Sequence, residues 1–97
     1  MHVIRPETLE AFWTRHPSAE GPLRAWLDTV LEARWERADE VKATYATASI
    51  VGKRRVVFNV GGNKYRLVVK VSYRTKVVFV RFIGTHDEYD EIDVMTV

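Results

Sequence analysis

Cysteine is absent from this chain of 97 residues. Its absence excludes disulfide bonds, cysteine-ligated zinc and thiol nucleophiles, and it fits a reducing compartment. Long apolar runs are missing as well: the longest are about four or five residues, whereas roughly 20 are needed to span a bilayer. No basic segment followed by an apolar run opens the chain, so we expect no signal peptide. We therefore expect a cytoplasmic protein that does not enter a membrane.

The chain is short and ordinary in composition. It is 46% hydrophobic and 29% charged, with three Trp and four Phe to fill a core. This length matches one compact domain, and such a small domain buries only a modest core. We expect a single domain over residues 1–97, and we find no repeat, low-complexity segment or linker.

The basic residues are segregated along the chain, which the net charge of +2 conceals. Residues 1–52 carry six Lys or Arg and eight acids, and residues 86–97 carry five acids and no Lys or Arg. The segment between them has no acid and nine cations: Lys53, Arg54, Arg55, Lys64, Arg66, Lys70, Arg74, Lys76 and Arg81. This segregation predicts a strong local positive potential and a polyanion, first of all nucleic acid, as partner. The alternative is a solvated sheet face that an acidic tail partly neutralises.

Apolar spacing predicts a strand at residues 2–4 and then helices. Residues 9, 12, 13 and 16 follow the spacing of one helix face after Pro6, and Pro17 ends that helix. Ser18 is the expected N-cap of the next helix. Its apolar stripe is Leu23, Trp26, Leu27, Val30, Leu31 and Trp35. We interpret this Trp-containing stripe as core packing, and we expect one further helical turn within residues 39–47, with Val41 and Tyr45 inward.

Three strands are expected after Gly52, at residues 55–60, 65–73 and 76–83, because these runs are rich in Val, Phe and Tyr. Gly61-Gly62-Asn63 and Arg74-Thr75 supply the tight connections. Arg66 and Lys70 should share one strand face, about 13 Å apart at roughly 3.3 Å per residue. The order of elements predicts an α+β fold of two layers, with the helices on one face of a small antiparallel sheet.

The basic segment and the residues after it contain what metal-independent RNA cleavage needs. One group must take the proton of the ribose 2′-OH, another must protonate the leaving 5′-oxygen, and cations must stabilise the phosphorane. His86 and Tyr89 supply groups for proton transfer or base stacking, and Arg66 supplies a phosphate-binding fork. We expect no metal, since His2, His16 and His86 share no ligand spacing, and we expect no cofactor. From the residues alone, a histidine such as His86 is more often a surface or capping residue, and Arg66 could pair with an acid near the C-terminus.

The chain resembles HigB-type mRNA interferases of the RelE-like toxin–antitoxin family. The resemblance extends over nearly the whole chain. It rests on the opening Met-His-Val-Ile, on residues 16–26, on the run Phe58-Asn59-Val60-Gly61-Gly62-Asn63-Lys64-Tyr65-Arg66-Leu67, and on Thr85-His86-Asp87-Glu88-Tyr89-Asp90. It implies a RelE-like fold, with an N-terminal strand and helical pair packed on a small antiparallel sheet. It also implies cleavage of mRNA, typically in the ribosomal A site, and inhibition by a helix-turn-helix antitoxin.

The resemblance also assigns roles to residues. It implies that Arg66 contacts the scissile phosphate, that His86 is catalytic, and that Tyr89 stacks on a base or takes part in proton transfer. Lys53, Arg54, Arg55, Lys64 and Lys70 are expected to bind the RNA backbone. Asp87, Glu88 and Asp90 either act on His86 or form a surface for the antitoxin.

Two other functions remain open for a chain of this fold. A gyrase-directed toxin would poison a protein partner without cutting RNA. An inactive RNA-binding module would bind RNA harmlessly and with a steep dependence on salt.

Overall fold

A computed structural model describes residues 1–52 and 54–97 of the chain. Lys53, one of the expected RNA-binding residues, lies outside the described residues. The elements in chain order are β1 (His2–Ile4), α1 (Glu7–Arg15), the 3₁₀ turn η1 (Pro17–Ala19), α2 (Glu20–Glu32), α3 (Ala38–Thr44), β2 (Ser49–Val51), β3 (Arg55–Val60), β4 (Tyr65–Ser72), β5 (Val77–Thr85) and α4 (His86–Asp90).

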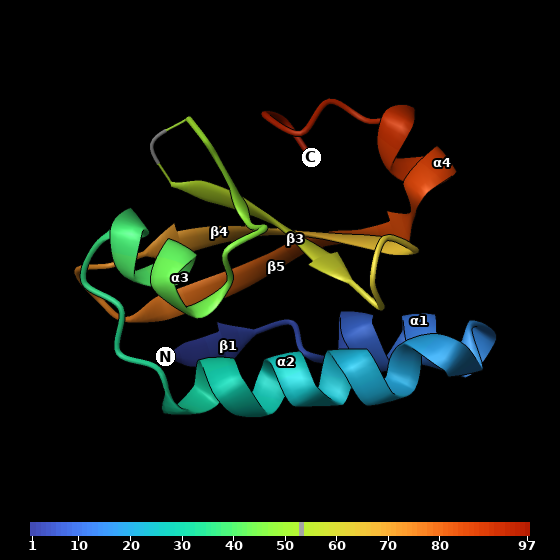
Figure 1. Cartoon of the computed structure of the whole chain (residues 1–97), viewed down its shortest axis with the longest axis horizontal. Coiled ribbons are helices and arrows are strands. Elements are labelled where there is room, and N and C mark those ends of the chain that lie inside the picture. Colours follow the sequence, from blue (N-terminus) through green and yellow to red (C-terminus); the bar gives the residue numbers. More distant parts are fainter. Residues whose placement is uncertain (53) are drawn as a thin grey trace.

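The five strands form one sheet in the order β1-β5-β4-β3-β2. β1 pairs with β5 in parallel, and the other neighbours are antiparallel. Helices α1 and α2 lie side by side on one side of this sheet, as Figure 1 shows. The predicted N-terminal strand, the three-stranded meander and the two-layer α+β architecture are therefore confirmed.

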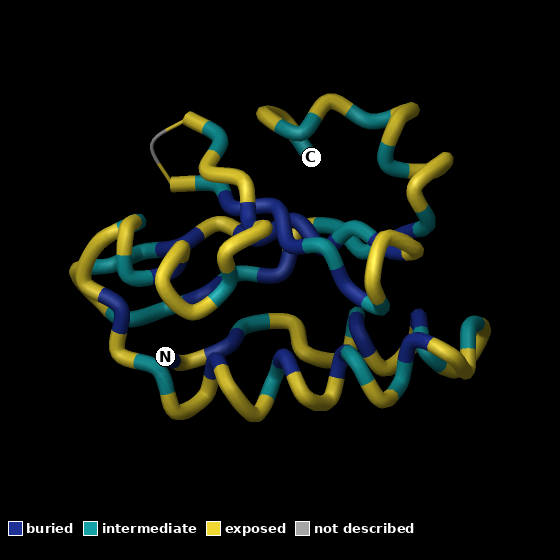
Figure 2. The backbone as a smooth tube through the Cα atoms, in the orientation of Figure 1, coloured by how far each residue is buried: buried dark blue, intermediate teal, exposed yellow. Residues whose placement is uncertain are grey.

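The core lies between the sheet and the helical pair. Leu23, Trp26 and Val30 of α2 are almost fully buried against the alternate residues of β4, such as Leu67 and Val69. The tube in Figure 2 is dark along these facing sides and pale on the outward turns of the helices. Burial of these apolar side chains is the main force that fixes the helices on the sheet.

Three details of the helix prediction were wrong. The N-cap of α2 is Ala19, and Ser18 lies inside η1, where its hydroxyl hydrogen-bonds to the Tyr65 hydroxyl. The helix ends at Glu32, so Trp35 reaches the core from an extended segment rather than from the helix. Leu31 is 51% exposed and does not belong to the buried stripe.

Two short elements were not expected from the sequence. The three residues of β2 add an edge strand beside β3, and the five residues of α4 follow directly on β5. The register of β4 with β5 also shifts between Val68 and Val69, where Val68 lies opposite Phe82 and Val69 opposite Val80. None of the helices in the described residues is both long and apolar enough to cross a membrane.

Candidate RNA-binding and catalytic site

The sheet face turned away from α1 and α2 carries the basic residues, and we call it the outer face. Its side chains follow from the strand registers as three rows across β3, β4 and β5: Arg55–Lys70–Phe79, Val57–Val68–Phe82 and Asn59–Arg66–Gly84. None of these residues belongs to the helix-side core. The predicted common face of Arg66 and Lys70 is therefore confirmed. Two basic rows flank an apolar middle row on one surface.

Arg66 lies at the end of the outer face where β3 turns into β4. The turn is residues 61–64, and Gly61 and Gly62 adopt φ values of 65° and 70°, which glycine tolerates. The Arg66 guanidinium donates to the backbone oxygens of Asn63 and Tyr65 at 3.1 and 3.3 Å, and to Asn63 Oδ1 at 3.4 Å. The expected alternative, an acidic partner near the C-terminus, does not occur among the described residues.

Helix α4 brings His86 to the same end of the sheet. The strand register pairs Tyr65 with Thr85 and Arg66 with Gly84, and the His86 N–H donates to the Lys64 carbonyl at 3.2 Å. His86 thus begins α4 directly beside the turn that holds Arg66. The structure brings together three of the predicted residues: Lys64, Arg66 and His86.

A capping box fixes the start of α4. Glu88 N–H donates to Thr85 Oγ1 at 3.2 Å, and Thr85 N–H donates to Glu88 Oε1 at 2.8 Å. The bond from the Thr85 backbone holds the pKa of the Glu88 carboxyl below its usual range. Both donors at this helix end are satisfied, so the backbone of His86 has a defined orientation.

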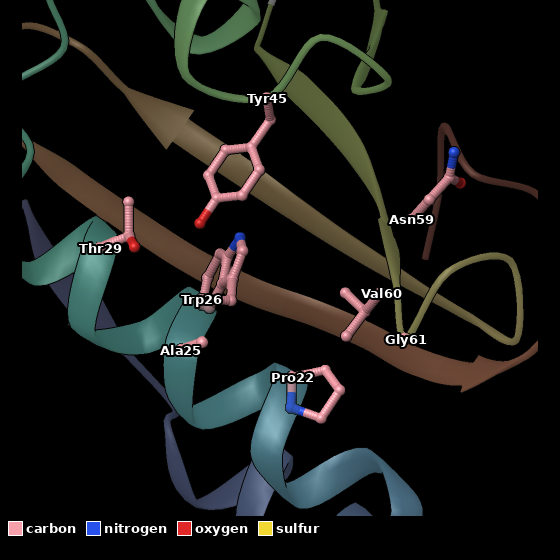
Figure 3. Close-up of a pocket in the computed structure, with 8 residues that line it drawn as sticks. All are labelled: Pro22, Ala25, Trp26, Thr29, Tyr45, Asn59, Val60 and Gly61. Atoms are coloured by element: carbon pink, nitrogen blue, oxygen red, sulfur yellow. The ribbon is translucent and has the colours of Figure 1, made fainter.

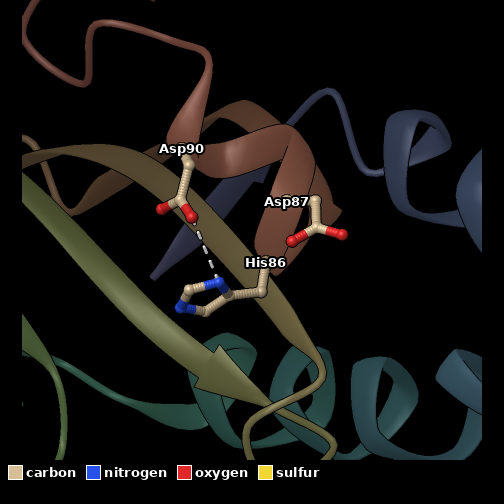
Figure 4. A group of neighbouring side chains, drawn as sticks. All are labelled: His86, Asp87 and Asp90. Atoms are coloured by element: carbon tan, nitrogen blue, oxygen red, sulfur yellow. Dashed lines mark ion pairs between the residues drawn. The ribbon is translucent and has the colours of Figure 1, made fainter.

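His86 pairs with Asp90 one helical turn along α4. Its Nδ1 lies 3.4 Å from Asp90 Oδ2, and both side chains are more than half exposed (Figure 4). Spacing of four residues places the two side chains on one helix face. With Nδ1 facing Asp90, Nε2 is the imidazole atom available to a substrate.

His86, Asp87 and Asp90 are also the residues that could approach a metal ion, since one ligand atom from each lies within 4.8 Å of the others. All three are exposed, and Asp90 is already engaged with His86. Two adjacent helix residues and one exposed pair make an open, loosely defined donor set, unlike a closed metal site whose ligands are oriented by further contacts.

The other predicted residues lie along the outer face or beside it. Lys70 is exposed and lies opposite the half-buried Arg55, with Arg54 just before β3, while Tyr89 is half-buried in α4. Of the ion pairs found in residues 1–52 and 54–97, none involves a Lys or Arg from the stretch 54–85. Among the described residues, these positive charges are thus not neutralised by Asp or Glu side chains.

The structure adds contacts that the sequence did not specify. Asn63 holds Arg66, and of the three acids considered beside His86 it is Asp90 that pairs with it, for which the His-x-x-x-Asp spacing was a usable signal. Arg81 joins Arg55 on the outer face, and both donate to the Val97 carbonyl oxygen, at 3.2 and 2.6 Å. The C-terminal segment therefore lies across the part of the outer face that carries Arg55 and Arg81.

The fold and the site define an α+β protein with a basic sheet face and a histidine-bearing helix at its end. Residues 19–92 match the family described as HigB_toxin, the RelE-like toxic component of a toxin–antitoxin system. The chain belongs to this family, which confirms the resemblance stated from the sequence.

Curated relatives agree with this placement. The mRNA interferase toxin HigB of Escherichia coli (strain K12) and the mRNA interferase HigB of Shigella flexneri are each 28% identical over 92 residues, which cover 93% of this chain and 88% of the relative. The mRNA interferase HigB of Escherichia coli O6:H1 (strain CFT073) is 24% identical over 94 residues, or 95% of this chain and 91% of the relative.

Proposed function

We propose that this chain is the toxin of a type II toxin–antitoxin module and cuts mRNA as a metal-independent endoribonuclease. The observation that carries the proposal is the placement of Arg66 and His86 at one end of a face whose cations have no carboxylate partners among the described residues. The names of the relatives, mRNA interferases, support the same activity. The proposed location is the cytoplasm, and the proposed setting of the cut is the ribosomal A site.

The proposed reaction is attack of a ribose 2′-oxygen on the adjacent phosphate. The O2′–P bond forms as the 2′-OH loses its proton, and the P–O5′ bond breaks as the 5′-oxygen gains one, leaving a 2′,3′-cyclic phosphate. Nε2 of His86 carries one of these protons, and Asp90 holds the ring through Nδ1. The fork of Arg66 stabilises the charge of the phosphorane, and the turn backbone keeps that fork in place.

The remaining residues bind the RNA on either side of the cut. Tyr89, adjacent to Asp90 in α4, is proposed to stack on a base next to the scissile phosphate. Arg54, Arg55, Lys64 and Lys70 are proposed to contact neighbouring phosphates. Lys53 is proposed to do the same, from its position in the sequence. The proposed protein partner is a helix-turn-helix antitoxin that blocks this surface.

The test is to map mRNA ends by primer extension in cells that express the wild type, His86→Ala or Asp90→Asn. We expect new cuts in the wild type, almost none in His86→Ala, and reduced cutting in Asp90→Asn. Circular dichroism of the purified variants checks that each remains folded, which is expected because both side chains are exposed. Growth arrest without new cuts would overturn the nuclease proposal in favour of a gyrase-directed toxin, and harmless expression would favour an inactive RNA-binding module.

A further inference from the structure

The C-terminal segment crosses the outer face of the sheet. After α4 the chain turns back over the sheet toward the connection of β2 and β3, on the side opposite α1 and α2 (Figure 1). We call residues 93–97 the strap. Its turn is closed by the Asp93 carbonyl, which accepts from the N–H groups of Thr96 and Val97 at 3.1 and 3.0 Å. The strap therefore has a defined conformation on the surface where RNA is proposed to bind.

Two arginines hold the far end of the strap. Arg55 Nη1 and Arg81 Nε donate to the Val97 backbone oxygen at 2.6 and 3.2 Å. Each guanidinium carries five N–H donors, and neither arginine has a carboxylate partner among the described residues. Two such forks that converge on one oxygen make a site suited to a phosphate. A backbone oxygen of the chain itself occupies that site here.

Arg81 enters this site from an irregular position in β5. Val69 lies opposite Val80 and Val68 lies opposite Phe82, so Arg81 between them has no partner on β4. An extra residue of this kind leaves the regular ladder, and its side chain is re-aimed, as in a β-bulge. The irregularity in β5 thus accompanies the approach of Arg81 to the oxygen that Arg55 binds.

The two arginines lie away from the proposed cut. Arg55 is opposite Lys70, which is four residues from Arg66 along β4, or about 13 Å at roughly 3.3 Å per residue. A phosphate bound by Arg55 and Arg81 therefore belongs to a nucleotide other than the one that is cut.

Met95 holds the middle of the strap by a small apolar contact. A side chain at position 52 would collide with it, because a Cβ added to Gly52 would lie 2.9 Å from Met95 Cε. Met95 is still 51% exposed. A segment held by one exposed side chain and one shared oxygen opens at low free-energy cost.

The pocket on the helix side of the sheet offers no comparable site. It has a volume of about 250 Å³ and lies between α2, Tyr45 and Asn59 at the end of β3 (Figure 3). None of the eight residues that line it is charged. A phosphate would find no counter-charge there, in contrast to the position of the Val97 oxygen.

We propose that Arg55 and Arg81 form a second phosphate site for RNA, and that the strap masks this site until RNA displaces it. The inference rests on the nuclease proposed above, and it adds Arg81 and a masking segment to the RNA-binding surface. A phosphate presents charged oxygens to both forks in place of the single Val97 oxygen, so the exchange favours RNA. Because the strap must leave first, its closed state lowers the apparent affinity for RNA.

Displacement of the strap is tested by methionine methyl NMR on His86→Ala, which prevents cleavage. The chain has two methionines, so the spectrum contains two methyl signals. Met1 is 8% exposed and serves as the internal control. On addition of single-stranded RNA, the Met95 signal should sharpen and move to the position of a free methionine, while the Met1 signal stays. If RNA binds and the Met95 signal does not change, the masking is overturned.

The phosphate site is tested by salt titrations of RNA binding, also in His86→Ala. Arg81→Gln should weaken binding and reduce the slope of log K against log salt by about 0.7, the contribution of one phosphate contact. Arg24→Gln makes the same change of charge in the opposite layer and should leave the slope unaltered. A slope that Arg81→Gln does not change would overturn the site.

A third comparison joins the two parts of the proposal. Met95→Ala loosens the strap without a change of charge and should bind RNA severalfold more tightly, whereas Leu31→Ala, at an equally exposed position, should match the wild type. Arg81→Gln should cost more affinity in Met95→Ala than with the strap intact, because no strap is then released to offset the loss. Equal costs in the two backgrounds would contradict the masking.

The outcomes separate this inference from the proposed function. If the wild type cuts RNA while Arg81→Gln and the Met95 signal behave as if no strap were displaced, only the second site and its mask fail. If RNA binds to none of these proteins and none is cut, the nuclease fails with them.

Discussion

Arg66 is held in place by its own turn rather than by an acid. Its three bonds go to oxygens of Asn63 and Tyr65, which orient the guanidinium without cancelling its charge. A carboxylate partner would have to be displaced before a phosphate could bind. An arginine fixed by neutral acceptors is therefore prepared for an anionic ligand.

The first prediction concerns this side chain. Arg66→Ala should reduce the single-turnover rate of mRNA cleavage by about 100- to 1000-fold, as removal of a transition-state donor does. Arg66→Lys should recover only part of the rate, because lysine keeps the charge and loses the fork. Arg74→Ala, in the turn at the far end of β4, is the control and should leave the rate unchanged. A rate for Arg66→Ala equal to that of this control would remove Arg66 from the mechanism.

The second prediction concerns the cluster His86, Asp87 and Asp90. If these side chains act without a metal, cleavage by the protein should be equally fast in excess EDTA and after re-addition of Mg²⁺ or Mn²⁺. The measurement is the initial rate on ribosome-free single-stranded RNA, because ribosomes need Mg²⁺ themselves and do not survive excess EDTA. A rate that EDTA abolishes and Mn²⁺ restores on free RNA would make the cluster a metal site.

At the scale of elements, α4 depends on its cap more than on packing, because none of its five residues is buried. Thr85→Ala removes the hydroxyl that accepts from Glu88 N–H, at a cost of about 1 kcal/mol to this helix. We expect faster amide exchange throughout α4 and slower mRNA cleavage, because His86 loses its fixed position. Thr85→Ser keeps the cap and serves as control. Unaltered exchange in Thr85→Ala would show that something other than the cap orders α4.

The same cap predicts a pH dependence. The pKa of Glu88 is held below its usual range by the Thr85 backbone, so its contribution to α4 is complete at neutral pH and is lost as the pH falls through that lowered pKa. Chemical shifts of the α4 amides should follow this titration on the acid side. In Glu88→Gln the side chain still accepts from Thr85 but does not titrate, so this step should disappear. A step that persists in Glu88→Gln would assign it to another carboxylate.

The long elements were predictable because their patterns are strong. β3 is rich in Val and Phe, β4 has an apolar side chain at each odd position from Tyr65 to Val71, and the α2 stripe repeats at helical spacing. β2 has only Ser-Ile-Val, which is too short to show an alternating pattern. This segment is a strand because it pairs with β3. α4 has no apolar stripe, so its only signal was Thr85-x-x-Glu88, the pattern of a capping box.

The candidate site was predictable in its residue types and only in part in its geometry. Charge segregation indicated a basic surface, and strand alternation placed Arg66 and Lys70 on one face. The hydrogen bond from His86 N–H to the Lys64 carbonyl could not be predicted. It depends on where β5 ends relative to the start of β4, which only the strand pairing shows. The pocket beside Asn59 also left no trace in the sequence, because it forms where β2 stops and α2 passes the end of β3.

At the scale of the whole molecule, the acids and cations are separated in space as well as in sequence. The outer face gathers cations from three strands, while the ion pairs of the described residues lie in α2, α4 and at the start of α3. Such a surface attracts a polyanion over distances of about 8 Å at physiological ionic strength.

This separation predicts a steep dependence of RNA binding on salt. With His86→Ala to prevent cleavage, log K for a single-stranded RNA should fall linearly with log salt, by about 0.7 for each phosphate contact. Arg55→Gln with Lys70→Gln should lower the slope by about 1.4 if each contacts one phosphate. Arg24→Gln, on the opposite layer, should not change it. A slope that the double variant leaves intact would place the RNA elsewhere.

The parallel pairing of β1 with β5 has a consequence for synthesis of the protein. His2 is matched with Val77, which is added to the growing chain 75 positions later. At about 5–20 residues per second, the first strand waits roughly 4–15 s for its partner. The surface that joins Arg66 to His86 is therefore completed only when the last strand has left the exit tunnel.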